Sequence, residues 1–273
     1  MRAEGAGEPG GWSRSRFVAN CSILFAEIPT LERPAAARDA GFEMIESWWP
    51  FSSAHPDSDD VDAWVGAVES AGVQLVAQNF FTGSTGDRGI LVAADRESEF
   101  ENAIESLGEI ARRLGCRMFN APYGRLDPLQ PADAQHATAH RHLERLAEFA
   151  AGLDATILLE PMSGIADYPI TSVADVDKVT SALSDHAREH IGLLADLYHL
   201  GRNGEDVDAL LTQPGAIAHV QIADAPGRHE PGTGSLPIRR WLDALDRNGY
   251  DRRVALEYEP STDAAHAFDW LTA

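Results

Sequence analysis

The chain has 273 residues, of which 43 are acidic and 22 are basic, so its formal net charge is −21. This charge repels nucleic acids and anionic membrane surfaces, and we expect neither as a partner. No apolar run approaches the roughly 18–20 residues that are needed to span a bilayer.

The first fifteen residues, MRAEGAGEPGGWSRS, have no apolar stretch of the kind found in a signal peptide. We interpret residues 1–15 as a flexible leader and expect residues 16–273 to form a single domain. Cys21 and Cys116 lie within apolar runs, which favours buried free thiols over a disulfide. These features predict a cytoplasmic protein.

Short β-rich segments alternate with segments of helical periodicity along the rest of the chain. Phe100, Ile104 and Leu107, for example, recur at the i, i+4, i+7 spacing of a buried helical stripe. Several helical segments run into a glycine, where a helix commonly ends before a strand. The expected strands are residues 17–25, 42–47, 73–80, 118–121, 156–160, 192–196, 218–222 and 254–258.

Repeated strand–helix units predict a parallel sheet covered by helices. About eight such units in about 250 residues match the size of a (β/α)₈ barrel. A doubly wound open sheet is the competing fold, but no GxGxxG motif follows the first expected strand. We therefore predict an α/β fold, a single (β/α)₈ TIM barrel, with its chemistry at the C-terminal ends of the strands.

Each of the last four expected strands carries a polar side chain at its end. One such residue could equally hydrogen-bond a loop, but four on consecutive strands of a closed barrel should converge at one rim. Crowded carboxylates raise one another's pKa unless a cation lies among them. Oxygen ligands suit Mg²⁺ or Mn²⁺ better than Zn²⁺. The four residues are Glu160, Asp196, Gln221 and Glu257.

The segment HVQIADAPGRHEPGTG, residues 219–234, passes from an apolar strand into a loop rich in Gly, Pro, Arg and His. Its glycines lack the spacing of a phosphate-binding P-loop. Arg228 is the best candidate for binding a substrate carboxylate, because its planar guanidinium matches that anion. His229 is a second candidate that could instead fix the loop, and Glu230 could pair with Arg228.

These segments resemble the hydroxypyruvate isomerase family, within the xylose-isomerase-like TIM barrels that also include ketose 3-epimerases. The likeness extends from Phe17 onward and is clearest in FVANCSILFAEIP, DLYHLGR, HVQIADAPGRHEPGTG, LDRNGY and LEYEP. It implies a metal-assisted isomerisation of a short hydroxy-carbonyl acid in a catalytic barrel spanning residues 16–273. The family pattern implies one divalent metal, Mg²⁺ or Mn²⁺, at Glu160, Asp196, Gln221 and Glu257. It also implies that Glu160 and Glu257 are the acid/base pair.

Other residues match the family pattern less directly. His199 corresponds to the histidine of an Asp-x-x-His segment that reaches the substrate oxygens. Glu46, at the end of the second expected strand, matches a recurrent glutamate, for which a supporting structural role is an equal alternative. The aromatic residues that follow it could line the pocket or pack against the barrel rim. They are Trp48, Trp49 and Phe51.

The chain also departs from the family pattern near the substrate. The loop NFFTGSTGDRGI lacks a usual tryptophan, Ser163 replaces an asparagine, and Ser235 replaces a glutamate. Glu259 replaces a lysine and is a rival metal ligand if it points inward. The expected metal ligands are therefore retained while the surrounding loops have changed.

We predict a divalent-metal-dependent isomerase that interconverts a short 2-oxo-3-hydroxy acid and its aldehyde isomer. Hydroxypyruvate and tartronate semialdehyde are such a pair. A ketose 3-epimerase or another sugar-acid isomerase of the same superfamily is one alternative. A non-catalytic metal-dependent sugar-binding protein is another. An abasic-site endonuclease needs a basic DNA-binding face, which a chain with one lysine does not offer. The aromatic content permits a homo-oligomer without requiring one.

Overall fold

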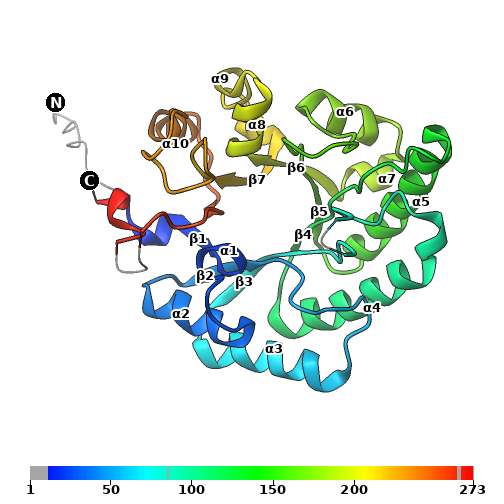
Figure 1. The fold of residues 1–273 in the computed structure, drawn as a ribbon, viewed down its shortest axis with the longest axis horizontal. Coiled ribbons are helices and arrows are strands. Elements are labelled where there is room, and N and C mark those ends of the chain that lie inside the picture. The colour runs from blue at the N-terminus through cyan, green and yellow to red at the C-terminus, as the bar shows by residue number, and fades with distance from the viewer. Residues whose placement is uncertain (1–11, 85, 263–265, 273) are drawn as a thin grey trace, which may run out of the picture.

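The computed structural model describes residues 12–84, 86–262 and 266–272. Eight parallel strands form a closed barrel in the order β1 to β8, and β8 pairs with β1. Helices surround the strands as an outer ring (Figure 1). The predicted single (β/α)₈ barrel is confirmed. Of the predicted leader, residues 1–11 lie outside the described residues. The strands are β1 Phe17–Asn20, β2 Met44–Ser47, β3 Gln74–Asn79, β4 Met118–Asn120, β5 Thr156–Leu159, β6 Ile191–Asp196, β7 Ile217–Ile222 and β8 Val254–Leu256.

The long helices pack against the barrel through the apolar stripes that the sequence predicts. Phe100 and Leu107 have no exposed surface, and Ile104 is 5% exposed. Gly72 and Gly115 end their helices in the left-handed conformation, where a residue without Cβ is favoured. The α-helices are α1 Cys21–Leu24, α2 Arg33–Asp39, α3 Ser58–Ala71, α4 Glu97–Leu114, α5 Ala132–Ala151, α6 Val173–Ser181, α7 Asp185–Arg188, α8 Leu197–Asn203, α9 Val207–Leu210 and α10 Ile238–Arg247.

Short 3₁₀ turns connect some of these elements. They are η1 Arg14–Arg16, η2 Thr30–Glu32, η3 Ala94–Arg96, η4 Pro214–Ala216 and η5 Asp269–Leu271.

The first strand is shorter than the sequence predicts. We expected residues 17–25 to be extended, but β1 ends at Asn20 and the chain turns into the short helix α1. Asn20 Oδ1 accepts a hydrogen bond from the backbone N–H of Ser22 at 3.1 Å and so caps this helix. The apolar pattern of the segment did not reveal the turn, because the residues of α1 are also buried.

The last strand is also shorter than predicted, and this changes where Glu259 lies. β8 ends at Leu256, so Glu257 and Glu259 follow the strand and do not share one of its faces. Glu257 is 5% exposed, whereas Glu259 is exposed. Glu259 therefore does not point into the barrel, as a rival metal ligand would have to.

Both cysteines are buried and free, as the sequence predicts. Burial raises the pKa of each thiol to about 12. Among the described residues, no helix is both long enough and apolar enough to cross a bilayer.

Candidate active site

Four polar side chains from consecutive strands meet at the C-terminal end of the barrel. Glu160 and Glu257 directly follow β5 and β8, Asp196 ends β6, and Gln221 lies next to the end of β7. Asp196 and Gln221 are paired in the register of β6 and β7. All four side chains are buried, with exposures between 0% and 5%. The four polar residues that the sequence places at strand ends therefore form one cluster at the barrel rim.

Glu46 is a hydrogen-bonding centre beside this cluster. Its carboxylate accepts hydrogen bonds from Asn20 Nδ2 at 2.9 Å and from Gln221 Nε2 at 2.7 Å. His219 Nε2 lies 2.7 Å from the other oxygen of Glu46. Glu46 is 2% exposed and does not line the cavity at the barrel mouth. Its position fits the supporting role that the sequence left open as an alternative to substrate binding.

Gln221 is oriented by this contact with Glu46. Because its amide nitrogen donates to Glu46, its oxygen Oε1 is directed elsewhere, and this oxygen is buried with no hydrogen-bond partner among the described residues. A buried carbonyl oxygen without a partner is uncommon and calls for an explanation such as an ion. Gln221 Oε1 is therefore available as a metal ligand.

Arg228 lies among the carboxylates instead of pointing freely into the cavity. Its Nη2 is 3.0 Å from Asp196 Oδ2 and also donates to Glu257 Oε2. Its Nε donates to the backbone carbonyl of Glu257 at 3.2 Å. The guanidinium therefore places a positive charge beside the carboxylates, where the sequence predicts a metal ion. Arg228 still lines the cavity, but its donors are largely used by the protein.

Glu257 has two further donors on its other oxygen. Asn20 Nδ2 lies 3.0 Å from Glu257 Oε1, and Trp48 Nε1 lies 2.8 Å from the same atom. Elsewhere on the same rim, Asn120 Nδ2 donates to Glu160 Oε2 at 2.8 Å. Each glutamate is therefore held in orientation by an asparagine at the end of another strand.

Burial and nearby negative charges raise the pKa of both glutamates. Burial and the charge of Asp196 raise the pKa of Glu160 to about 8, while Arg228 acts in the opposite direction. Burial also raises the pKa of Glu257 well above its ordinary value, against the lowering effect of Arg228. A carboxyl group with a pKa of about 8, such as that of Glu160, can exchange protons near pH 7.

His199 is neutral, and its hydrogen bonds define its tautomer. Burial lowers the pKa of His199 to about 4, although the charge of Asp196 opposes this. The backbone N–H of Ser163 donates to Nδ1 at 3.0 Å, so the ring proton of the neutral form is on Nε2. Nε2 lies 3.7 Å from both Glu160 Oε1 and Asp196 Oδ2. Although His199 is close enough to ligate a metal with these carboxylates, the protonated Nε2 suits it to donate a hydrogen bond.

The residues at this rim fit one divalent cation. They supply three carboxylates and one unpartnered amide oxygen, which is the ligand chemistry of Mg²⁺ or Mn²⁺. A second group, His186, Glu189 and His190, could also hold a metal, but two of these residues are exposed. That group precedes β6, at the end of the strand opposite to Asp196.

The candidate active site opens into a cavity of about 490 Å³. Glu160, His199, Arg228 and Glu257 line it together with the aromatic residues after β2. Trp49 packs against Phe51 and Phe81, with ring centroids 5.4 Å and 6.0 Å apart. The aromatic wall is therefore part of the cavity; its members after β2 are Trp48, Trp49 and Phe51.

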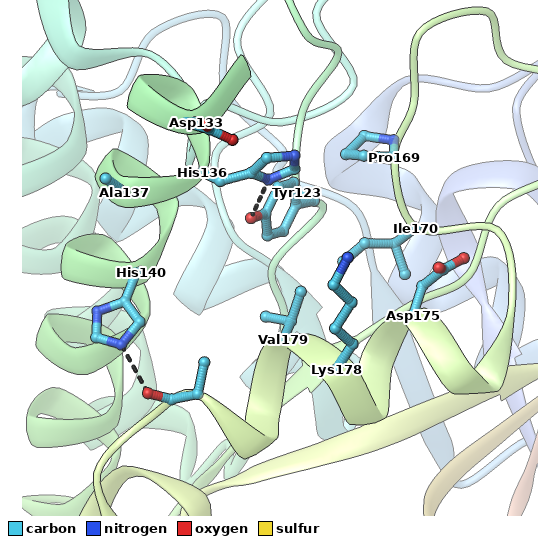
Figure 2. Close-up of a pocket in the computed structure, with 11 residues that line it drawn as sticks. Tyr123, Asp133, His136, Ala137, His140, Pro169, Ile170, Asp175, Lys178 and Val179 are labelled. Atoms are coloured by element: carbon cyan, nitrogen blue, oxygen red, sulfur yellow. Dashed lines mark hydrogen bonds between the residues drawn. The ribbon is translucent and has the colours of Figure 1, made fainter. Parts of the chain in front are cut away.

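A larger cavity of about 590 Å³ lies between α5 and α6 (Figure 2). Tyr123, His136, His140 and Lys178 line it, and the Tyr123 hydroxyl is hydrogen-bonded to His136 Nδ1 at 3.0 Å. None of the predicted site residues lines this cavity. The cavity at the barrel mouth is therefore the candidate active site.

The loop of residues 223–236 is organised around the buried carboxylate of Asp224. Its two oxygens accept hydrogen bonds from the backbone N–H groups of Ala225, Gly232, Gly234 and Leu236, at 2.8–2.9 Å. A Cβ at Gly234 would lie 2.2 Å from the carbonyl oxygen of Ala225, so only glycine allows this close approach. The loop is closed on itself and presents Arg228 to the carboxylate cluster.

His229 and Glu230 face away from the cavity within this loop. His229 Nδ1 lies 2.7 Å from the carbonyl oxygen of Glu259, and His229 does not line the cavity. Its contacts fit the alternative in which it fixes the loop. Glu230 pairs with Ser261, whose backbone N–H donates to it at 2.9 Å, and not with Arg228. Ser235 also fixes the loop, because its N–H donates to Ala225 O at 2.7 Å.

Several residues of the site were missed in the sequence. Asn20 and Asn120 end β1 and β4, so the rule that identified the other strand-end residues could have found them. Arg88 and Arg202 line the cavity from loop and helix positions, for which no periodicity gives a signal.

Comparison with known proteins places this fold and site in a family. A family model described as xylose isomerase-like TIM barrel matches residues 34–273. The chain therefore belongs to the xylose isomerase-like TIM barrel family.

Its relatives define the group within that family. A Streptomyces coelicolor protein, provisionally named a hydroxypyruvate isomerase, is 43% identical over 96% of this chain and 98% of its own length. A 2-oxo-tetronate isomerase from Cupriavidus necator is 29% identical over 94% of this chain and 97% of its own. A crystal structure from Brucella melitensis, described as an AP endonuclease of family 2, has a TM-score of 0.80 at 29% identity, and the match covers 94% of this chain and 97% of that chain. Within the barrel family the chain is a member of the hydroxypyruvate isomerase family, and it is an isomerase.

Proposed function

We propose that the protein is a divalent-metal-dependent isomerase that interconverts a short 2-oxo-3-hydroxy acid and its aldehyde isomer. Hydroxypyruvate and tartronate semialdehyde are the three-carbon pair of this type, and the relatives named for hydroxypyruvate and 2-oxo-tetronate support the substrate class. Glu160, Asp196, Gln221 and Glu257 would hold the metal. The buried, unpartnered oxygen of Gln221 beside three buried carboxylates is the observation that carries the proposal.

The two glutamates suit proton transfer between adjacent carbons. They follow β5 and β8, which lie three strands apart in the ring, so their carboxyl groups approach a substrate from different sides. Both have raised pKa values because of burial. A bound divalent cation would polarise the substrate carbonyl and stabilise the negative charge that develops on its oxygens.

The proposed reaction conserves every atom of the substrate. For hydroxypyruvate, one glutamate removes a proton from C3 and the other delivers a proton to C2, while the proton of the 3-hydroxyl moves to the oxygen on C2. The intermediate is an enediol. The Nε2–H of His199 faces Arg228 Nη1 at 3.3 Å, and since both are donors, an acceptor oxygen of the substrate placed between them would satisfy both.

Metal removal tests this function directly. We expect chelation followed by dialysis to abolish turnover of hydroxypyruvate, and Mn²⁺ or Mg²⁺ to restore it. In D₂O, deuterium should enter the product at the carbon that receives the proton, as followed by proton NMR. Full activity in protein shown by elemental analysis to hold no metal would overturn the metal requirement.

A substrate panel separates this reaction from epimerisation. Neutral ketohexoses and ketopentoses should not be converted, whereas hydroxypyruvate or 2-oxo-tetronate should be isomerised. Conversion of neutral ketoses to their C3 epimers, without turnover of either acid, would replace the proposal with a ketose 3-epimerase.

A further inference from the structure

Three arginine side chains line the cavity at the barrel mouth, and only one of them is engaged with the carboxylate cluster. Arg228 donates to Asp196 and Glu257. Arg202, on α8, has one hydrogen bond to the described residues, from Nη1 to the hydroxyl of Tyr198 at 2.9 Å. Arg88, in the loop after β3, has no hydrogen bond or ion pair within the described part of the chain. The cavity therefore contains two guanidinium groups with donors to spare.

Arg202 and Arg228 lie in one region of the cavity that Arg88 also lines. The guanidinium carbons of Arg202 and Arg228 lie 5.2 Å and 5.1 Å from the ring centroid of Tyr198. Arg228 Nη1 also lies 3.3 Å from His199 Nε2. His199 is itself 3.7 Å from Glu160, so the positive region borders the catalytic carboxylates.

The backbone that carries Arg88 has an unusual conformation. Its φ is +58°, in the left-handed region that residues other than glycine rarely adopt, and Arg228 has the same φ of +58°. The next residue is Gly89, where a Cβ would lie 1.9 Å from the carbonyl oxygen of Pro122. Asp87 anchors the turn on its other side through Arg96, at 2.7 Å. Strained residues of this kind are retained mainly at functional sites.

The guanidinium of Arg202 lies close to a second glycine. Gly164, which also lines the cavity, has a φ of +74°, and a Cβ there would lie 3.3 Å from Arg202 Nη2. A larger residue at Gly164 would restrict the space that the guanidinium occupies. Gly89 and Gly164 thus leave room at the cavity wall for the loop of Arg88 and for the guanidinium of Arg202.

We propose that Arg88 and Arg202 form an anion subsite that binds the carboxylate of the substrate, so that the enzyme selects hydroxy-keto acids over neutral hydroxyketones. The planar guanidinium group pairs with a carboxylate through two parallel hydrogen bonds. The substrate chain then extends from this subsite toward Glu160 and Glu257, and Arg228 remains with the carboxylate cluster. The substrate orientation rests on the proposed function, whereas the anion subsite can be tested without turnover.

The cavity has room for acids longer than hydroxypyruvate. Its volume of about 490 Å³ falls within the roughly 300–1,000 Å³ of pockets that take drug-sized ligands. Four-carbon acids such as 2-oxo-tetronate are therefore included in the substrate class.

Steady-state kinetics of Arg88→Gln and Arg202→Gln test the subsite. For hydroxypyruvate and 2-oxo-tetronate we expect each substitution to raise KM by at least about tenfold, a loss of ~1.4 kcal/mol, with a much smaller change in kcat. Arg240→Gln is the matched control, because Arg240 is exposed, pairs with Asp208 at 2.7 Å and does not line the cavity. KM values of both variants equal to that of the control would overturn the proposal.

A binding experiment separates failure of the subsite from failure of the proposed function. Erythronate, a four-carbon hydroxy acid without the 2-oxo group, and its neutral counterpart erythritol are titrated by calorimetry into the full-length protein. Erythronate should bind the wild type and Arg240→Gln, and at least about tenfold more weakly (~1.4 kcal/mol) to Arg88→Gln and Arg202→Gln. If no acid is turned over but this pattern holds, the proposed function fails and the subsite stands. Absence of erythronate binding to the wild type, or equal binding to all variants, would exclude the subsite.

Discussion

Arg228 and Asp196 form an ion pair at the C-terminal rim of the barrel, in which Nη2 lies 3.0 Å from Oδ2 and the Asp196 side chain has no exposed surface. The same guanidinium donates to Glu257. An arginine in this position neutralises the carboxylates that the proposed metal would neutralise, so the two cations compete electrostatically.

Replacing Arg228 should therefore strengthen metal binding while it weakens catalysis. For Arg228→Gln we expect Mn²⁺ to bind about tenfold more tightly, a gain of ~1.4 kcal/mol, because a competing positive charge is removed. Calorimetric titration of the chelated, dialysed protein measures this affinity. Arg240→Gln removes the same charge from the surface and should bind Mn²⁺ as the wild type does. Equal or weaker Mn²⁺ binding by Arg228→Gln would contradict the competition.

The second prediction compares two glutamates that are two residues apart. Glu257 is buried and contacts Asn20, Trp48 and Arg228, whereas Glu259 is exposed. Glu257→Gln should keep the fold but lower kcat by more than about tenfold, a loss of over ~1.4 kcal/mol, because the amide cannot exchange a proton. Glu259→Gln should retain wild-type kcat. Circular dichroism checks the fold, and similar kcat values for the two variants would refute the role of Glu257.

The third prediction concerns the loop that carries Arg228. Asp224 accepts four backbone hydrogen bonds from this loop. Asp224→Ala should therefore lower the free energy of unfolding by about 2 kcal/mol. Each donor left without a partner costs ~1–3 kcal/mol, but some of these N–H groups can turn to water. KM should rise as the loop loosens. Urea denaturation measures the stability, with the exposed Asp251→Ala as control. A loss no larger than that of the control would show that Asp224 does not organise the loop.

The fourth prediction is a pH-dependent contribution to stability at the start of α6. Asp175 accepts hydrogen bonds from the backbone N–H groups of Thr171 and Ser172 at 2.9 Å and 3.0 Å and completes a capping box with Ser172. Burial alone would raise the pKa of Asp175, but these hydrogen bonds outweigh it and the pKa is lowered. A lowered pKa in the folded state stabilises the protein above the unfolded pKa of about 3.9, and this stabilisation is lost as pH falls through the folded value.

Asp175→Asn should therefore lower the free energy of unfolding by about 1 kcal/mol at pH 7, the usual value of such a cap. The difference from wild type should shrink as the pH falls below about 4, where the carboxyl group is protonated in the unfolded chain. Urea denaturation at several pH values measures both quantities. A difference that stays constant down to the acid range would mean that the charge of Asp175 contributes nothing.

The sequence by itself determined the barrel and the strand-end residues of the candidate site. Strand alternation and helical periodicity are local patterns, and a closed ring of parallel strands brings their C-terminal ends together. Hence Glu160, Asp196, Gln221 and Glu257 could be identified before the structure. Asn20 and Asn120 obey the same rule, but the apolar run that continues past Asn20 obscured the end of β1.

Only the tertiary structure decided how the remaining polar residues are used. Whether Arg228 faces a substrate or Asp196 depends on a loop closed around Asp224, and whether Glu46 meets a ligand depends on Asn20, His219 and Gln221 from other strands. These contacts join residues far apart in the chain, so no local pattern encodes them. The guanidinium groups of Arg88 and Arg202 reach the cavity for the same reason, because their loop and helix are positioned by packing and not by periodicity.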